Sequence, residues 1–131
     1  MVCAPVIFGC AGTILTEEER DFFSGIDPYG FILFRRNISE PDQLRQLTSS
    51  LRDSVRDPCV PIFVDQEGGR VDRLGPPHWS ARPPALVLAS RFQEDLEAAC
   101  RAIRLNSRLM ARDLVDCGIS VSCMPVLDLA L

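Results

Sequence analysis

Lysine is absent from this 131-residue sequence, and all 14 of its basic residues are arginine. The arginines are scattered along the chain, so they indicate a compositional bias of the genome and do not predict a basic surface. The net charge at neutral pH is −4. Because a nucleic-acid-binding chain normally carries clustered positive charge, we expect no nucleic-acid partner.

Long apolar runs, a leader and paired cysteines are also absent. No apolar run reaches the length of about 18 residues that a membrane span needs, so we expect no membrane association. The first five residues, Met-Val-Cys-Ala-Pro, lack the basic and apolar segments of a signal peptide. None of the cysteines forms a C-x-x-C pair, which favours buried free thiols in a reducing cytoplasm over disulfides or a metal site. The six cysteines are Cys3, Cys10, Cys59, Cys100, Cys117 and Cys123.

Several catalytic and nucleotide-binding signatures are missing. The sequence contains no G-x-x-x-x-G-K-[ST], no G-x-G-x-x-G and no G-x-S-x-G segment. Its single histidine, His78, lies beside Trp79 in a proline-rich loop. A lone loop histidine could act as an acid or base, but the bystander interpretation is favoured. Trp79 could stack on a sugar ring or pack the loop onto the fold.

What is present is an alternation of short apolar runs and amphipathic stretches. Hydrophobic residues make up 47% of the chain, which together with its length predicts one packed domain. The apolar runs predict buried strands, and these cover residues 5–9, 31–34, 60–64 and 119–127. Residues 27–30, Asp-Pro-Tyr-Gly, predict a turn before the second strand.

Three helices are predicted between these strands. Thr16 and Glu19 have the spacing of a capping box that opens a helix ending near Gly25. Pro41 suits the first turn of a second helix, whose apolar stripe continues to Val55. The third helix has apolar residues at helical spacing from Phe92 to Leu114, and Gly118 suits its carboxyl-terminal cap. The order β-α-β-α-β-α-β predicts an α/β fold with a parallel sheet.

Polar residues follow three of the predicted strands. They are Arg35-Arg36-Asn37, Asp65-Gln66-Glu67 and Asp128. Because ligands of parallel α/β folds bind at the carboxyl ends of the strands, we expect these groups to converge on one face.

Asp65 and Glu67 allow three interpretations. Two residues apart on a regular strand, they would lie about 6.6 Å apart on one face, near the separation of a glycosidase carboxylate pair. Together with Asp128 they could also hold a divalent cation. Alternatively, one carboxylate pairs with Arg70 or Arg73 and fixes the loop.

The glycine pair Gly68-Gly69 follows these carboxylates. Two glycines let the backbone turn sharply or approach a ligand closely. They also bend the chain at this point, which weakens the argument from regular strand spacing.

Three segments in this order resemble the amino-terminal half of family 3 glycoside hydrolases. They are GFILFRRNI, VDQEGGRVDRL and MPVLDL. The resemblance is to the bacterial β-N-acetylglucosaminidase (β-hexosaminidase) branch. It implies the amino-terminal half of a TIM (β/α)₈ barrel of about four βα units, with residues 1–131 as a partial domain ending after strand four. It also implies a retaining enzyme that releases terminal N-acetylglucosamine from cell-wall muropeptides in cytoplasmic peptidoglycan recycling, without a metal or cofactor and as a monomer at full length.

The resemblance assigns roles to particular residues. Asp65 and Arg73 match the residues that hold the non-reducing sugar. The site-shaping residues are Gln66, Glu67, Gly68, Gly69, Arg70 and Asp128. For the loop residues Gln66, Glu67 and Arg70 we expect internal salt bridges and hydrogen bonds.

No residue matches the nucleophilic aspartate or the acid/base histidine of the family, and a full barrel needs about 250 residues. We therefore expect no catalytic residue in this chain and no hydrolase activity from it alone. The alternative is a non-catalytic sugar-binding fragment or pseudoenzyme. A half-barrel could also self-associate to cover its last strand edge.

Overall fold

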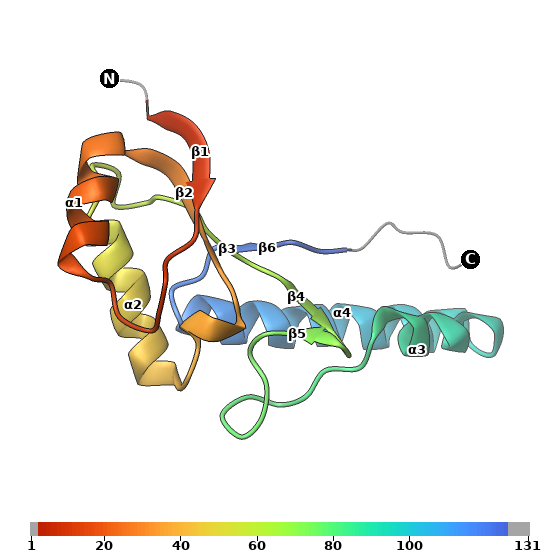
Figure 1. Ribbon diagram of the computed structural model, residues 1–131. Coiled ribbons are helices and arrows are strands. Elements are labelled where there is room, and N and C mark those ends of the chain that lie inside the picture. The colour runs from red at the N-terminus through yellow and green to blue at the C-terminus, as the bar shows by residue number, and fades with distance from the viewer. Residues whose placement is uncertain (1–2, 126–131) are drawn as a thin grey trace.

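Four short parallel strands form the central sheet of the computed structural model, which describes residues 3–125. They are β1 (Ala4–Phe8), β2 (Pro28–Leu33), β3 (Ile62–Val64) and β6 (Val121–Ser122). Their order in the sheet is β1-β2-β3-β6, and each neighbouring pair is parallel. Strands that follow one another along the chain are therefore neighbours in the sheet, as repeated βα units require (Figure 1).

Three helices of these units pack on one face of the sheet. They are α1 (Glu17–Ile26), α2 (Pro41–Asp53) and the long α4 (Leu96–Asp116). The short α3 (Ala85–Ser90) has no buried residue and lies against α4 instead. Side chains alternate along a strand, and the fully buried residues of β2 and β3 are the alternating ones. These strand residues join one core with residues of α1, α2 and α4. Its main members are Phe23, Phe31, Leu33, Leu44, Leu47, Leu51, Ile62, Val64 and Leu114.

Local sequence signals predicted the starts of α1 and α2 correctly. Thr16 and Glu19 form the predicted capping box at the start of α1, and Pro41 is the first residue of α2. Gly118 follows α4 with a φ of +76°, as the predicted cap requires. Phe92 was wrongly placed on the third helix: it lies in the separate 3₁₀ turn η2 (Arg91–Gln93).

The predicted turn at residues 27–30 is wrong. Asp27 alone makes the turn, with a φ of +54°, and its N–H donates to the Phe23 carbonyl at 2.8 Å. Pro28 then begins β2 and pairs with Ala4 of β1. The strand is consequently longer at its start than the apolar run suggested.

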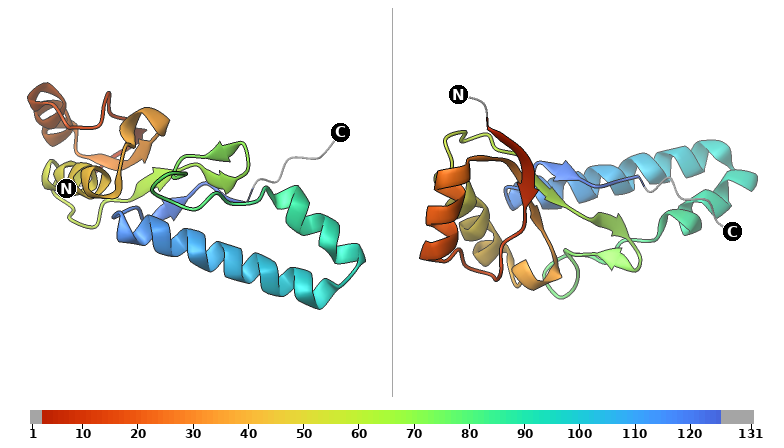
Figure 2. Two further views of the ribbon diagram at one scale, coloured as in Figure 1. Left: turned by 90° about the horizontal axis from the view of Figure 1, so that it is seen from below. Right: turned by 45° about the horizontal axis from the view of Figure 1, so that its top comes forward.

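Two further strands form a feature that the sequence did not predict. β4 (Gln66–Gly68) and β5 (Val71–Asp72) make an antiparallel hairpin directly after β3. Two turned views show this hairpin beside the sheet, while α3 and the start of α4 extend beyond it (Figure 2). The exposed apolar side chains Leu86, Leu96 and Leu105 lie on these two helices.

The cysteines are free thiols within the described residues, as expected, but they are not uniformly buried. Cys10 and Cys117 are buried, whereas Cys59 and Cys123 are exposed. Within residues 3–125, none of the helices combines the length and the apolar character needed to cross a bilayer.

Candidate functional site at the carboxyl ends of the strands

The predicted groups after β2 and β3 do converge. Asp65 follows β3 directly, and its Oδ2 accepts a hydrogen bond from Arg73 Nη2 at 3.0 Å. Arg35 comes from the 3₁₀ turn η1 (Arg35–Asn37) after β2, and its Nη1 donates to the Arg73 carbonyl at 2.8 Å. The Asp65 and Arg73 side chains keep 25% and 28% of their surface exposed. This pair is therefore ordered by the protein and still reachable by a ligand. Asp128 lies outside the described residues.

The other two residues after β2 are structural. Asn37 is fully buried, and its Nδ2 donates to the carbonyls of Cys10 and Gly12 at 3.0 and 2.8 Å. Arg36 donates from Nε to the same Cys10 carbonyl and lies over the Phe34 ring. These contacts join the segment after β1 to the segment after β2, and they fix the backbone next to Arg35.

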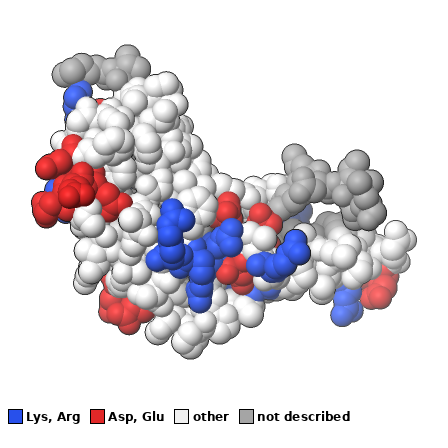
Figure 3. Space-filling model, viewed as in Figure 1, with Lys and Arg blue, Asp and Glu red and all other residues white. Residues whose placement is uncertain are grey.

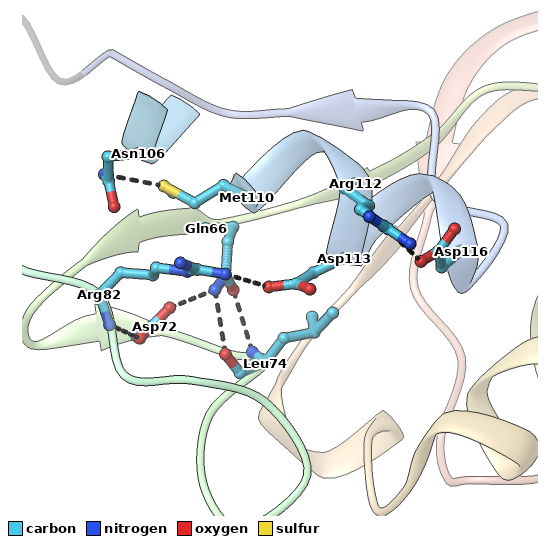
Figure 4. Close-up of polar contacts among 9 residues, drawn as sticks. All are labelled: Gln66, Asp72, Leu74, Arg82, Asn106, Met110, Arg112, Asp113 and Asp116. Atoms are coloured by element: carbon cyan, nitrogen blue, oxygen red, sulfur yellow. Dashed lines mark hydrogen bonds and ion pairs between the residues drawn. The ribbon is translucent and has the colours of Figure 1, made fainter. Parts of the chain in front are cut away.

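Gln66 sets the backbone position of Arg73. Its amide is buried, and its Oε1 accepts from the N–H groups of Arg73 and Leu74 at 3.0 and 2.9 Å. Its Nε2 donates to the Leu74 carbonyl and to the Asp72 carboxylate. Figure 4 shows the bonds from Gln66 to Asp72 and Leu74, which cross the hairpin. The expectation of internal hydrogen bonds in this loop is confirmed for Gln66.

Gly68 and Gly69 allow a close approach of the protein's own chain. Both have positive φ, at +86° and +65°. A Cβ on Gly68 would lie 2.4 Å from the Pro83 carbonyl oxygen, and one on Gly69 would lie 2.6 Å from Pro84 Cβ. The Gly69 N–H donates to the Arg82 carbonyl at 2.8 Å. The glycines thus shape the site by letting the segment 82–84 pack over the hairpin.

An ion pair that the sequence did not predict joins segment 82–84 to α4. Arg82 Nη2 lies 2.6 Å from Asp113 Oδ2 of α4, and the two side chains are 11% and 29% exposed. The Arg82 N–H also donates to Asp72 at 3.3 Å (Figure 4). Burial raises the pKa of Asp72, although the neighbouring Arg82 N–H and guanidinium oppose the shift. Asp72, Arg82 and Asp113 therefore link the hairpin to α4.

Glu67 and Arg70 behave differently from their prediction. No ion pair joins them to each other or to another described residue. They line a pocket of about 260 Å³ between the hairpin, the start of α3 and the residues after β6. The salt bridge expected for them is instead made by Asp65 with Arg73.

Cys123 is a site residue that the sequence did not single out. Its N–H donates to the Val64 carbonyl at 2.9 Å, which places it next to Asp65. Burial raises the pKa of its thiol, and the negative charge and hydrogen bond of Asp65 raise it further. An exposed neutral thiol therefore borders the Asp65 carboxylate. No sequence pattern distinguished it from the other cysteines.

His78 and Trp79 belong to the loop rather than to the site. His78 is exposed, and Trp79 is 9% exposed and part of the hydrophobic core. Of the two interpretations of Trp79, the one in which it packs the loop onto the fold is therefore confirmed. Among residues 3–125, no three His, Cys, Asp or Glu side chains are grouped so that they could hold a metal ion.

Comparison with known proteins places this chain in a family. The sequence pattern described as Glycosyl hydrolase family 3 N terminal domain matches residues 15–131. The chain belongs to the family 3 glycosyl hydrolases. The α/β fold with a parallel sheet is thereby confirmed as the amino-terminal part of the TIM-barrel-like domain of this family.

Relatives in the family carry the name beta-hexosaminidase. The protein of that name from Alkalilimnicola ehrlichii is 41% identical over 130 residues, which cover 98% of this chain and 36% of the relative. That from Chromobacterium violaceum is 41% identical over 125 residues, covering 95% of this chain and 34% of the relative. The chain therefore spans about a third of the length of these family 3 relatives.

Solved family 3 structures agree with the described fold. NagZ from Neisseria gonorrhoeae in complex with N-trifluoroacetyl-D-glucosamine has a TM-score of 0.90 and 38% sequence identity, over 97% of this chain and 38% of that one. A family 3 β-N-acetylglucosaminidase from Paenibacillus has a TM-score of 0.74 and 27% identity, over 91% of this chain and 22% of that one.

Proposed function

We propose that this chain is the sugar-holding, amino-terminal part of a β-N-acetylhexosaminidase. In this proposal the whole enzyme releases terminal N-acetylglucosamine from cell-wall muropeptides during peptidoglycan recycling in the cytoplasm. The observation that carries the proposal is the Asp65–Arg73 pair at the carboxyl end of β3. The pair belongs to a chain of family 3 that is similar to proteins named beta-hexosaminidase.

The chemistry of the pair suits a neutral sugar. The Asp65 carboxylate accepts hydrogen bonds from two ring hydroxyls, and the Arg73 guanidinium donates to a sugar oxygen. Charge-assisted bonds of this kind are worth about 1.5–3 kcal/mol each. The buried Gln66 amide holds the Arg73 backbone, so ligand binding costs little further conformational entropy at Arg73. No metal or cofactor takes part in this binding.

A binding titration of the 131-residue chain with N-acetylglucosamine tests the sugar site. Asp65→Asn and Arg73→Gln should each weaken binding by about tenfold or more, since each removes a charge-assisted bond. Asp21→Asn and Arg104→Gln make the same charge changes at exposed positions of α1 and α4, and should leave the affinity unchanged. Equal affinities for all five proteins would refute the assignment.

The 131-residue chain alone is proposed to be inactive. Neither the nucleophilic aspartate nor the acid/base histidine of the family resemblance has a counterpart in this sequence. Its one histidine, His78, is exposed beside the ring of Trp79. The assay is release of the aryl group from an aryl N-acetyl-β-glucosaminide. Turnover by the purified chain that clearly exceeds the uncatalysed rate would contradict this part of the proposal.

A second candidate is a non-catalytic sugar-binding module or pseudoenzyme. It is favoured by the same lack of catalytic groups together with an intact Asp65–Arg73 pair. Both candidates predict sugar binding without turnover, so binding alone does not separate them. Sequencing the gene beyond codon 131 does: an in-frame continuation carrying the missing histidine and aspartate supports the enzyme.

The expected partners extend the proposal. The ligand is a carbohydrate, and neither nucleic acid nor a membrane is proposed. Within residues 3–125, β6 is an edge strand of the sheet and α4 carries exposed apolar residues, and both features favour self-association. Sedimentation velocity over a concentration series measures this directly, and a monomer at every concentration would count against it.

A further inference from the structure

Two guanidinium groups lie together at the candidate site, but within residues 3–125 only one of them has a carboxylate partner. Arg73 pairs with Asp65 at 3.0 Å. Arg35 is exposed, and its guanidinium donates from Nη1 to the Arg73 carbonyl at 2.8 Å. Among the described residues Arg35 forms no ion pair. In the part of the chain that the structure describes, a positive charge is therefore held in place at the rim of the site without a neutralising carboxylate.

The placement of Arg35 is fixed by the fold. Its neighbours Arg36 and Asn37 are anchored to the Cys10 carbonyl at 3.2 and 3.0 Å. Its Nη1 is anchored to Arg73, while the other donors of its guanidinium make no hydrogen bond to any residue of the range 3–125. On the face of the molecule that Figure 3 shows, basic side chains gather near the middle, with acidic side chains beside them. This gathering contrasts with the net charge of −4 of the whole chain.

We propose that Arg35 forms an acid-recognising subsite next to the sugar-holding pair, which takes a carboxylate on the group linked to the terminal N-acetylglucosamine. The Asp65 carboxylate meets the tip of the Arg73 side chain, and Arg35 meets the backbone of the same residue. A ligand that extends from Asp65 along Arg73 therefore reaches Arg35. This inference rests on the proposed function, because it needs the sugar to sit at Asp65.

The chemistry favours a carboxylate over another hydroxyl. A guanidinium fork with free donors binds the two oxygens of a carboxylate side by side. Asp65 repels such a group, so an acidic ligand is directed away from Asp65 and towards Arg35. The sugar end and the acidic end of one ligand are thus distinguished by charge.

The test compares a neutral with an acidic disaccharide on the 131-residue chain by titration calorimetry. The neutral ligand is N,N′-diacetylchitobiose. The acidic ligand is N-acetylglucosaminyl-N-acetylmuramic acid with a free lactyl carboxylate. A third arm uses the same disaccharide with a peptide on the lactyl group, so that its carboxylates lie on the peptide. Either acidic ligand should bind about fivefold more tightly than the neutral one, and salt should weaken that preference.

Variants of Arg35 separate recognition from a structural effect. Arg35→Gln should bring the affinity for the acidic ligand down to that for the neutral one, so that the preference is lost. Arg35→Lys should keep part of the preference, because it keeps the charge. Arg104→Gln, an exposed arginine of α4, should change neither affinity.

Each alternative result is decisive. Equal weakening of both ligands by Arg35→Gln would show that Arg35 only supports Arg73, and would overturn the subsite. An unmodified chain that binds both ligands equally would do the same while sparing the proposed sugar site. Failure to bind either ligand would refute the sugar site and the subsite together. A preference for only one acidic ligand supports the subsite and identifies which carboxylate it takes.

Discussion

Breaking the Arg82–Asp113 ion pair should loosen the segment that closes over the β4–β5 hairpin. Arg82→Met removes the guanidinium but leaves the backbone bonds from Gly69 N–H to the Arg82 carbonyl and from the Arg82 N–H to Asp72. The change therefore isolates the side-chain pair. Asp113→Leu removes the other partner, and the double variant completes a thermodynamic cycle.

The burial of the two side chains sets the expected magnitude. Breaking a fully buried pair costs about 3–5 kcal/mol, whereas an exposed pair is worth about 0–1 kcal/mol. Arg82 is 11% exposed and Asp113 29%, so the pair lies between these limits. We expect a coupling free energy of about 2 kcal/mol. Arg101→Met breaks an exposed pair with Glu97 and should cost less than about 0.5 kcal/mol.

Urea unfolding followed by tryptophan fluorescence measures this coupling. Trp79 is the single tryptophan of the chain; it is buried in the core and lies three residues before Arg82. The fluorescence therefore reports on the segment that the pair holds. A coupling free energy below about 0.5 kcal/mol, or an Arg82→Met variant as stable as Arg101→Met, would refute this account of the pair.

Three further predictions concern acid stability, the hairpin and the thiols. Burial raises the pKa of Glu19, but hydrogen bonds from Thr16 and Ala11 outweigh it and lower the pKa below 4.5. The stability from ionised Glu19 is therefore present above pH 4.5 and lost as the pH falls through the folded pKa. Urea midpoints of Glu19→Gln should fall less below that pH than those of the unmodified chain. Gly68→Ala should cost about 3 kcal/mol in urea unfolding, from positive φ and the clash with Pro83, whereas Gly12→Ala, whose Cβ meets nothing within 4 Å, should cost little. Maleimide labelling followed by mass spectrometry should modify the exposed thiols of Cys59 and Cys123 before the buried thiols of Cys10 and Cys117. Burial raises the pKa of Cys10 to about 11, which slows its reaction further. Equal labelling rates for the exposed and the buried thiols would contradict the structure.

The sequence predicted elements whose cause is local. The Thr16–Glu19 capping box needs only four residues, and its hydrogen bonds are those that the spacing requires. The order of strands and helices followed from apolar periodicity in the same way. The prediction of a four-residue turn before β2 was wrong because Asp27 adopts positive φ and makes the turn by itself. Pro28 was then free to begin the strand.

The site was predictable only in part, because half of it depends on distant partners. Asp65 and Arg73 lie in one motif eight residues apart, and pairing between them is one of the interpretations that the sequence allows. Arg82 and Asp113 are separated by 31 residues and occur in no recognisable pattern. The hairpin was also missed, since its strands are short, polar and interrupted by glycine. Such strands lack the alternation from which strands are predicted.

A polar loop can be rigid when its hydrogen bonds take the place of a hydrophobic core. The hairpin contributes little apolar surface, but the buried Gln66 amide uses both its oxygen and its nitrogen within the loop. Gly68 and Gly69 then let segment 82–84 pack directly on the backbone, and Arg82 joins that segment to α4. Each of these contacts is made by the chain itself and needs no ligand. The geometry of Arg73 is consequently set by buried polar groups that never touch the sugar, so changes at Gln66 or Arg82 should affect ligand binding through the position of Arg73, even though neither side chain lines the Asp65–Arg73 pair.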